Sequence, residues 1–119
     1  MSNVDIMRDL VVNQVLLNST ITYGEIAKVI GIDLSRIDER KRFNQYTGEM
    51  NDQDYNAGIP IHSPAIVHSD GDGYGSRGGW PGKGFWVYVD KANLRIPGED
   101  NDTVYIRLLA ELYDYYGVK

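Results

Sequence analysis

The stretch that decides the fold is residues 21–31, ITYGEIAKVIG, which carries signals for the start and the end of a short helix. Thr22 precedes Glu25 by three residues, the capping-box spacing in which the two side chains satisfy free backbone donors at a helix start. Gly31 can adopt the left-handed conformation that commonly ends a helix. We therefore predict a helix over residues 23–30, preceded by the polar break at residues 18–20.

Further helices are predicted on both sides of this stretch. Apolar residues recur at steps of three and four over residues 4–17, which places them on one helical face. A third, highly polar helix is expected over residues 35–46, and residues 47–58 are expected to form a long loop or an irregular helical turn. The helical spacing returns over residues 103–117, with Asp102 or Thr103 as the cap.

Between the third and the last helix the pattern changes to strands. Residues 65–68 follow two prolines and predict a short strand. Residues 69–84 contain seven glycines in sixteen positions and predict a long loop. Residues 85–89, FWVYV, are all aromatic or β-branched and predict the best strand of the chain. We expect the two strands to pair as a ribbon with the glycine-rich loop between them.

Length and composition narrow the possible classes of protein. The chain has 119 residues and a formal net charge of −5, which predicts one globular domain over residues 1–119. It has no cysteine, which excludes disulfides, thiolate nucleophiles and sulfur-ligated metal sites. Neither a secretory signal nor a membrane-spanning run is evident, so we expect a cytoplasmic protein with no membrane partner.

The order of these elements is that of an α+β, winged-helix-like domain. In that architecture the third helix is offered to DNA, and the loop between the strands forms the wing. Six of the twelve Lys and Arg residues lie in these two segments: Arg36, Arg40, Lys41 and Arg42 in the helix, and Arg77 and Lys83 in the loop. An alternative is that Asp38 and Glu39 pair with the neighbouring arginines and make the helix merely soluble.

The string from Thr22 to Ala27, TYGEIA, resembles the opening of the helix–turn–helix in the alkylguanine-DNA alkyltransferases and their inactive alkyltransferase-like relatives. Residues 59–67, IPIHSPAIV, with the glycines that follow, are similar in position to that family's Pro-Cys-His-Arg motif and glycine loop. Residues 81–86, PGKGFW, also resemble a segment shared by a set of small bacterial and phage proteins that have the same opening string.

Departures from the alkyltransferase pattern change the function that the resemblance implies. Ile61 stands where the alkyl-accepting cysteine would be, which excludes alkyl transfer, and Ser63 replaces the arginine of the motif, while His62 is retained. The resemblance implies that Tyr23 helps to turn a nucleotide out of the duplex and that Arg36 is the nearest candidate for the finger that fills the space. A pocket bounded by four residues would fit this role: Tyr23, Ile61, His62 and Trp80.

Candidate catalytic and metal sites are weak in this sequence. Ser63 and His62 are adjacent, but adjacency does not place the hydroxyl within reach of the imidazole. His62 and His68 would lie ~20 Å apart along an extended strand and could not share a metal directly. Asp70 and Asp72 resemble the start of a calcium loop, but Pro81 occupies the position that needs a bidentate glutamate. We expect no cofactor and no metal.

The sequence thus leads to two hypotheses of function. The first is a non-enzymatic, alkyltransferase-like protein that binds nucleic acid, duplex DNA in particular, through the third helix and the glycine-rich wing. The alternative is an acidic protein-binding module, such as a phage or mobile-element inhibitor of a basic host protein that binds nucleic acid.

Overall fold

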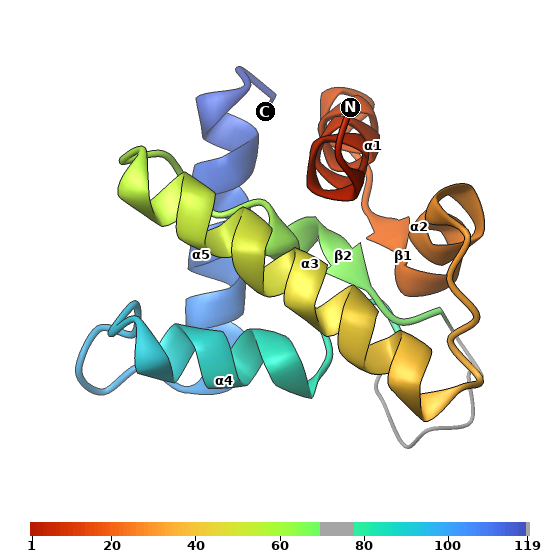
Figure 1. The fold of residues 1–119 in the computed structure, drawn as a ribbon. Coiled ribbons are helices and arrows are strands. Elements are labelled where there is room, and N and C mark those ends of the chain that lie inside the picture. Colours follow the sequence, from red (N-terminus) through yellow and green to blue (C-terminus); the bar gives the residue numbers. More distant parts are fainter. Residues whose placement is uncertain (70–77, 119) are drawn as a thin grey trace.

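The computed structural model describes residues 1–69 and 78–118. In these residues the chain forms five α-helices, one 3₁₀ turn and two short strands (Figure 1). In chain order the elements are α1 Asn3–Leu16, β1 Ile21–Thr22, α2 Tyr23–Ile30, α3 Ile37–Asn56, η1 Ser63–Ala65, β2 Ile66–Val67, α4 Lys83–Lys91 and α5 Asn101–Tyr115. The α+β class predicted from the sequence is confirmed, with helices as the dominant part.

Helix α2 has the bounds that its local signals predict. The hydroxyl of Thr22 accepts a hydrogen bond from the backbone N–H of Glu25 at 3.1 Å, and the Glu25 carboxylate accepts from the Thr22 N–H at 3.3 Å. Gly31 ends the helix at a φ of +76°, a conformation that side chains disfavour. Helix α1 is also confirmed, and α5 begins slightly earlier than expected because Asp100 is its N-cap.

Helix α3 is longer than the sequence predicts, because residues 47–56 continue the helix rather than forming a loop. Phe43 and Met50 are seven residues apart and both are buried in the core, which fixes one face of the helix through two turns. Asp54 extends this face and is itself buried in a polar network. Tertiary contacts therefore stabilise a segment whose composition alone favours a turn.

The strand predicted over residues 85–89 is wrong, because this segment lies in α4. Phe85 and Val89, four residues apart, are buried, whereas Val87 between them is 57% exposed. That burial follows the helical period rather than the alternating period of a strand. β-propensity depends on packing against neighbouring strands, and the described residues of α4 have no such neighbour.

The predicted ribbon is wrong for the same reason. Strand β2 lies within the predicted residues 65–68, but its partner is β1, with Ile21 opposite Ile66 in a parallel pair. The two-stranded ribbon that would support a wing is therefore not formed among the described residues. Arg77 and half of the predicted loop, residues 70–77, lie outside the described residues.

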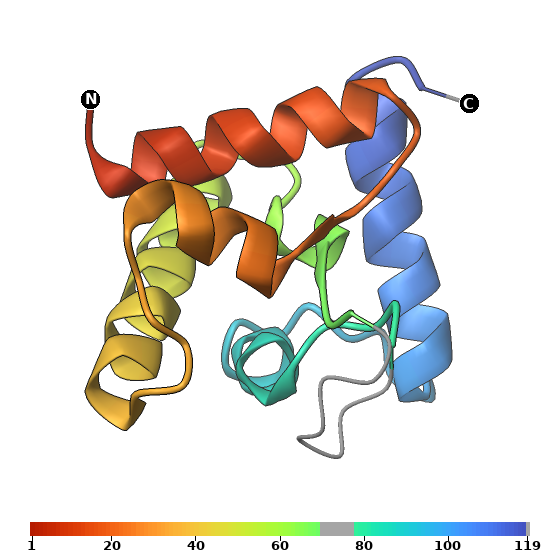
Figure 2. The ribbon, with the colours of Figure 1, turned by 90° about the vertical axis from the view of Figure 1, so that its right-hand side faces the viewer.

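Two hydrophobic clusters hold the described part together. The larger joins α1, α2, α3 and β2 with Leu112 of α5. The smaller joins Ile61, Phe85 and Val89 to the first half of α5. In Figure 2, α1 runs along the top of the molecule, α5 descends at the right, and α4 lies on the side opposite α1. Helix α4 thus forms a separate layer below α3, and the site described next lies between the two.

Within residues 1–69 and 78–118, no helix is both long and apolar enough to cross a membrane.

Candidate functional site

A pocket of about 550 Å³ lies where α2 begins, beside the middle of α3 and along the length of α4. This volume is within the range of roughly 300–1,000 Å³ that is usual for small-ligand sites. Its described lining residues are Tyr23, Gly24, Leu34, Arg40, Phe43, Asn44, Thr47, Gly48, Asn51, Ser63, Ile66, His68, Ser69, Gly82, Lys83, Gly84, Phe85, Val87, Tyr88 and Lys91. The pocket is therefore built from segments far apart in the sequence.

Two tyrosine hydroxyls fix α4 in position along the pocket. At one end, Tyr23 accepts a hydrogen bond from the backbone N–H of Gly82 at 2.8 Å. At the other end, Tyr88 donates to the carboxylate of Asp52 on α3 at 3.1 Å. Burial, assisted by that carboxylate, raises the pKa of Tyr88 to about 12. Both hydroxyls are consequently protonated at neutral pH and can keep these contacts.

A glycine is required at position 82 because the start of α4 lies close to the side chains of His68 and Tyr23. A Cβ added at Gly82 would lie 2.8 Å from Nε2 of His68 and 3.2 Å from the hydroxyl of Tyr23. The glycine lets the start of α4 meet the ring of Tyr23, which also packs on His68 at a ring-centroid distance of 4.7 Å. The spacing of the pocket wall thus depends on a missing side chain.

Apolar and aromatic side chains form most of the pocket wall. The ring of Tyr23 lies 5.6 Å from that of Phe43, and Leu34, Ile66 and Phe85 add further apolar surface. Burial raises the pKa of Tyr23, and the hydrogen bond from Gly82 opposes this rise. A flat apolar or aromatic group would be well accommodated here.

Charge in the described lining has one sign. Arg40, Lys83 and Lys91 contribute to the pocket, and the lining residues that the structure describes include neither aspartate nor glutamate. The whole chain carries 17 acidic residues against 12 basic ones, so this local excess is the reverse of the overall charge. An uneven distribution of this kind attracts anions to one place on an acidic protein.

Two buried polar atoms lie in the same lining. Asn51 is 3% exposed and Ser63 is 5% exposed. Neither Oδ1 of Asn51 nor Oγ of Ser63 has a hydrogen-bond partner among the described residues. Most buried polar atoms in proteins are paired, so both are unusual.

The structure separates the basic residues that the sequence grouped in the third helix. Arg36 pairs with Asp38 at 3.4 Å, and Arg42 pairs with Glu39 at 2.7 Å, so the alternative of local pairing holds for these two. Lys41 is exposed and does not line the pocket. Arg40 and Lys83 do line it, whereas Arg77 lies outside the described residues.

Of the four residues predicted to bound a pocket, Tyr23 alone lines the one described. Ile61 is buried in the smaller hydrophobic cluster. Trp80 packs against Tyr105 of α5, with ring centroids 4.8 Å apart. His62 is fully buried behind the wall. The described lining thus includes one of the four predicted residues, because the pocket lies along α3 and α4.

His62 belongs to a buried polar network that joins four elements. Its Nδ1 lies 2.8 Å from Oδ2 of Asp54, and its Nε2 contacts the hydroxyl of Tyr116. Arg8 of α1 donates to the other oxygen of Asp54 at 3.1 Å. Both imidazole nitrogens are thus occupied, and Ser63 is not paired with the ring. The arrangement joins α1, α3 and the end of α5, and the Ser63 hydroxyl is not part of it.

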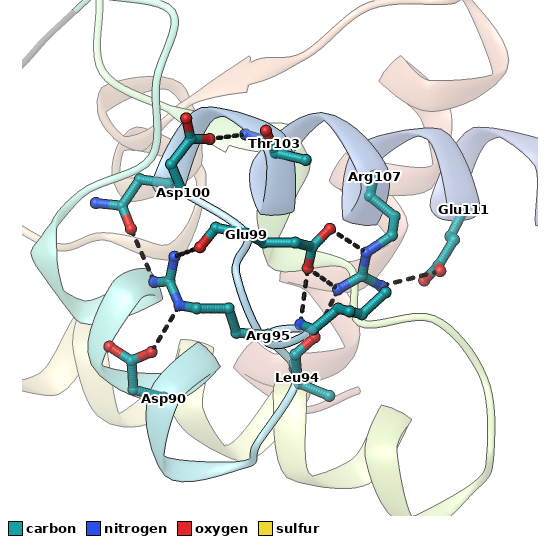
Figure 3. Close-up of polar contacts among 10 residues, drawn as sticks. Asp90, Leu94, Arg95, Glu99, Asp100, Thr103, Arg107 and Glu111 are labelled. Atoms are coloured by element: carbon teal, nitrogen blue, oxygen red, sulfur yellow. Dashed lines mark hydrogen bonds and ion pairs between the residues drawn. The ribbon is translucent and has the colours of Figure 1, made fainter.

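A second polar network fixes the connection between α4 and α5 (Figure 3). Arg107 contacts the carboxylate of Glu99 through two nitrogens, each at 2.9 Å, and donates to the carbonyl of Leu94. Arg95 bridges Asp90 at 3.1 Å and Asn101 at 2.8 Å. The pKa of Glu99 is lowered, mainly by the hydrogen bond from Arg107. These arginines have local partners and support the layer that contains α4.

Sequence reasoning missed Lys91, Asn51 and the role of α4 in the site. The glycines at 82 and 84 beside Lys83 were the available signal, but they were assigned to a loop that precedes a strand. Asn51 was placed in a polar loop and gave no signal of its own. Among the described residues, no group of three or more His, Asp or Glu side chains could hold a metal ion.

No family model matches the chain, and the searches of curated proteins and of solved structures found no similar protein.

Proposed function

We propose that this protein binds nucleic acid without catalysing a reaction, and that the pocket between α2, α3 and α4 is the contact site. The observation that carries the proposal is the described lining of the pocket, which combines three basic side chains with aromatic walls and no carboxylate. Phosphates require cations, and an unstacked base requires an apolar, flat-walled space. This pocket offers both on a protein of net charge −5.

Arg40, Lys83 and Lys91 are the groups that we expect to contact phosphates. Both lysines are exposed and belong to α4, while Arg40 reaches the pocket from α3. The N-cap of α4 is Gly82, without a side-chain cap, so the positive end of the helix dipole adds to their effect. The proposal keeps the third helix as a contact and replaces the wing with α4.

The aromatic wall supports entry of a single base. Stacking on an aromatic side chain stabilises a bound base by about 1–3 kcal/mol, and moving a base out of a duplex costs a few kcal/mol. The described lining includes the aromatic residues Tyr23, Phe85 and Tyr88, and the volume of about 550 Å³ leaves room for one base. A nucleotide that is already unpaired should therefore bind better than one in an intact duplex.

The test is a titration with two fluorescent 15-base-pair duplexes, one intact and one with a single bulged adenosine, over a series of salt concentrations. We expect the bulged duplex to bind more tightly, with an affinity that falls as salt rises. Lys83→Ala with Lys91→Ala should weaken binding and reduce the salt slope by about two, because two phosphate contacts are lost.

The matched control is Arg36→Ala with Lys41→Ala, which removes the same charge from residues outside the described lining. We expect this variant to retain the salt slope of the wild type. Absence of binding at low salt would contradict the proposal. Loss of the slope in the control, but not in the α4 variant, would instead place the contact at the start of α3.

A second candidate function is binding to a basic protein, favoured by the outer face of α5. Asp102, Ile106, Ala110 and Asp114 recur at four-residue steps and are all exposed, and Ile106 is 62% exposed. An apolar residue between acidic ones suits a basic partner with an apolar patch. No binding to either duplex, together with nuclease-resistant capture of a basic protein that Ile106→Glu abolishes, would favour this function.

A further inference from the structure

The pocket contains two polar atoms whose burial the fold does not explain. Oδ1 of Asn51 and Oγ of Ser63 are enclosed by the protein, yet neither has a hydrogen-bond partner in residues 1–69 and 78–118. A buried acceptor without a donor destabilises the folded state, whereas an apolar side chain of similar size would not. Because these two polar atoms destabilise the folded protein, a role in ligand binding would explain why they are present.

Neighbouring contacts do not account for these atoms. Asn51 lies on the buried face of α3 between Met50 and Asp54, where a leucine would satisfy the helical pattern. Ser63 begins the 3₁₀ turn next to His62, but both ring nitrogens of His62 have other partners. The two residues that carry these atoms belong to the described lining, together with the aromatic wall and the three basic residues.

We propose that Asn51 and Ser63 are specificity-determining residues that recognise the edge of a base carrying an amino group. This inference rests on the proposed binding of nucleic acid. Oδ1 of Asn51 can only accept, so it selects a ligand N–H donor. The hydroxyl of Ser63 can donate as well as accept, and in this proposal it donates a hydrogen bond to a ring nitrogen beside that amino group. Adenine presents this combination.

The specificity test compares two duplexes that differ by one amino group. Each carries a single bulged nucleotide, which is deoxyadenosine in one and deoxynebularine, its analogue without the 6-amino group, in the other. For the wild type we expect the adenosine bulge to bind about tenfold more tightly, since a buried acceptor left without its donor is costly. Asn51→Leu should reduce this ratio to about one.

Ser63→Ala should weaken the binding of both bulged duplexes, because deoxyadenosine and deoxynebularine both have the ring nitrogen that accepts the hydrogen bond from the hydroxyl. Asn13→Leu makes the same chemical change as Asn51→Leu at an exposed position of α1 outside the described lining. We expect this control to keep the tenfold preference.

Thermal unfolding gives a readout that separates recognition from structure. If Asn51 serves the ligand, Asn51→Leu should raise the melting temperature of the free protein, by about 4 °C for 1 kcal/mol in a chain of this size. A structural asparagine would instead lower it. The expected result is therefore a more stable protein that has lost its preference for the amino group.

The possible outcomes also separate this inference from the proposed function. If both bulged duplexes bind equally to the wild type, with the salt slope intact, the recognition by Asn51 and Ser63 is wrong and the nucleic-acid function stands. If neither duplex binds at low salt, both proposals fail. A lowered melting temperature in Asn51→Leu would overturn the specificity role.

Discussion

At the residue scale, the site depends on side chains with opposite requirements for space. Gly82 is needed because a methyl group would meet His68, while Tyr23 must reach the same backbone to hold the start of α4. Asn51 and Ser63 are polar where the packing would accept apolar residues. The pocket lining thus combines one missing side chain with two polar atoms that have no hydrogen-bond partner in the described part of the chain.

Gly82→Ala should destabilise the protein by about 1 kcal/mol, because the added Cβ would lie 2.8 Å from the His68 ring. Urea unfolding measures this effect. In the double variant with His68→Ala, the closest neighbour of the added Cβ is gone, so the cost of the alanine should shrink to what the 3.2 Å approach to the Tyr23 hydroxyl leaves. Gly84→Ala is the control, since its nearest neighbour is 4.0 Å away, and it should leave stability unchanged or slightly raised. An equal loss in both glycine variants would contradict the steric explanation.

At the scale of elements, α4 is a short helix that depends on its neighbours, and the pocket lies along its whole length. It has nine residues, too few for an isolated helix to be stable. Contacts at both ends hold it in place: Tyr23 at Gly82, and Arg95 with Asp90 near its C-terminus. The connection after it is fixed by Glu99 and Arg107 (Figure 3).

Glu99→Gln should destabilise this connection near neutral pH and have less effect in acid. The folded pKa of Glu99 lies below its ordinary value of 4.5, mainly because of the hydrogen bond from Arg107. Its contribution to stability is therefore fully present above that value and is lost as the pH falls through the lower folded pKa. Urea unfolding of both proteins between pH 7 and pH 3 should show the difference shrinking as the pH falls. Glu111→Gln, at an exposed partner of Arg107, should show a smaller difference, and a gap independent of pH would contradict the assignment.

At the scale of the whole molecule, a buried polar network connects elements that the sequence places far apart. Asp54 of α3 contacts Arg8 of α1 and His62 before β2, and His62 contacts Tyr116 at the end of α5. Asp54 is 1% exposed, so its charge depends on these partners. The network fixes the frame against which α4 and the pocket are placed.

Asp54→Asn should lower the free energy of unfolding by about 3 kcal/mol, because it removes the charge that Arg8 and His62 share and places an amide N–H against donors. The measurement is urea unfolding followed by circular dichroism. Asp52→Asn, two residues away at an exposed hydrogen bond to Tyr88, is the control and should cost less than about 1 kcal/mol. Similar losses in the two variants would show that the network does not support the fold as described.

The sequence by itself determined the elements whose signals are local. Thr22 and Glu25 begin α2, Gly31 ends it, and the apolar spacing of α1 and α5 gives both helices, because caps and helical periodicity act within a few residues. It also excluded cysteine chemistry, since the chain has no cysteine. Tyr23, Arg40 and Lys83, which the sequence assigned to nucleic-acid binding, line one pocket, and that assignment stays a prediction.

Only the tertiary structure decided the second half of α3, the helical state of residues 83–91 and the pairing of β2 with β1. In each case the deciding interaction is distant in sequence: Met50 packs in the core with α1, Phe85 and Val89 pack against α5, and Ile66 pairs with Ile21. The burial of apolar faces outweighed the local preferences for turn and strand. The placement of Asn51, Ser63 and Lys91 around one pocket followed from that packing, so no local sequence pattern indicated it.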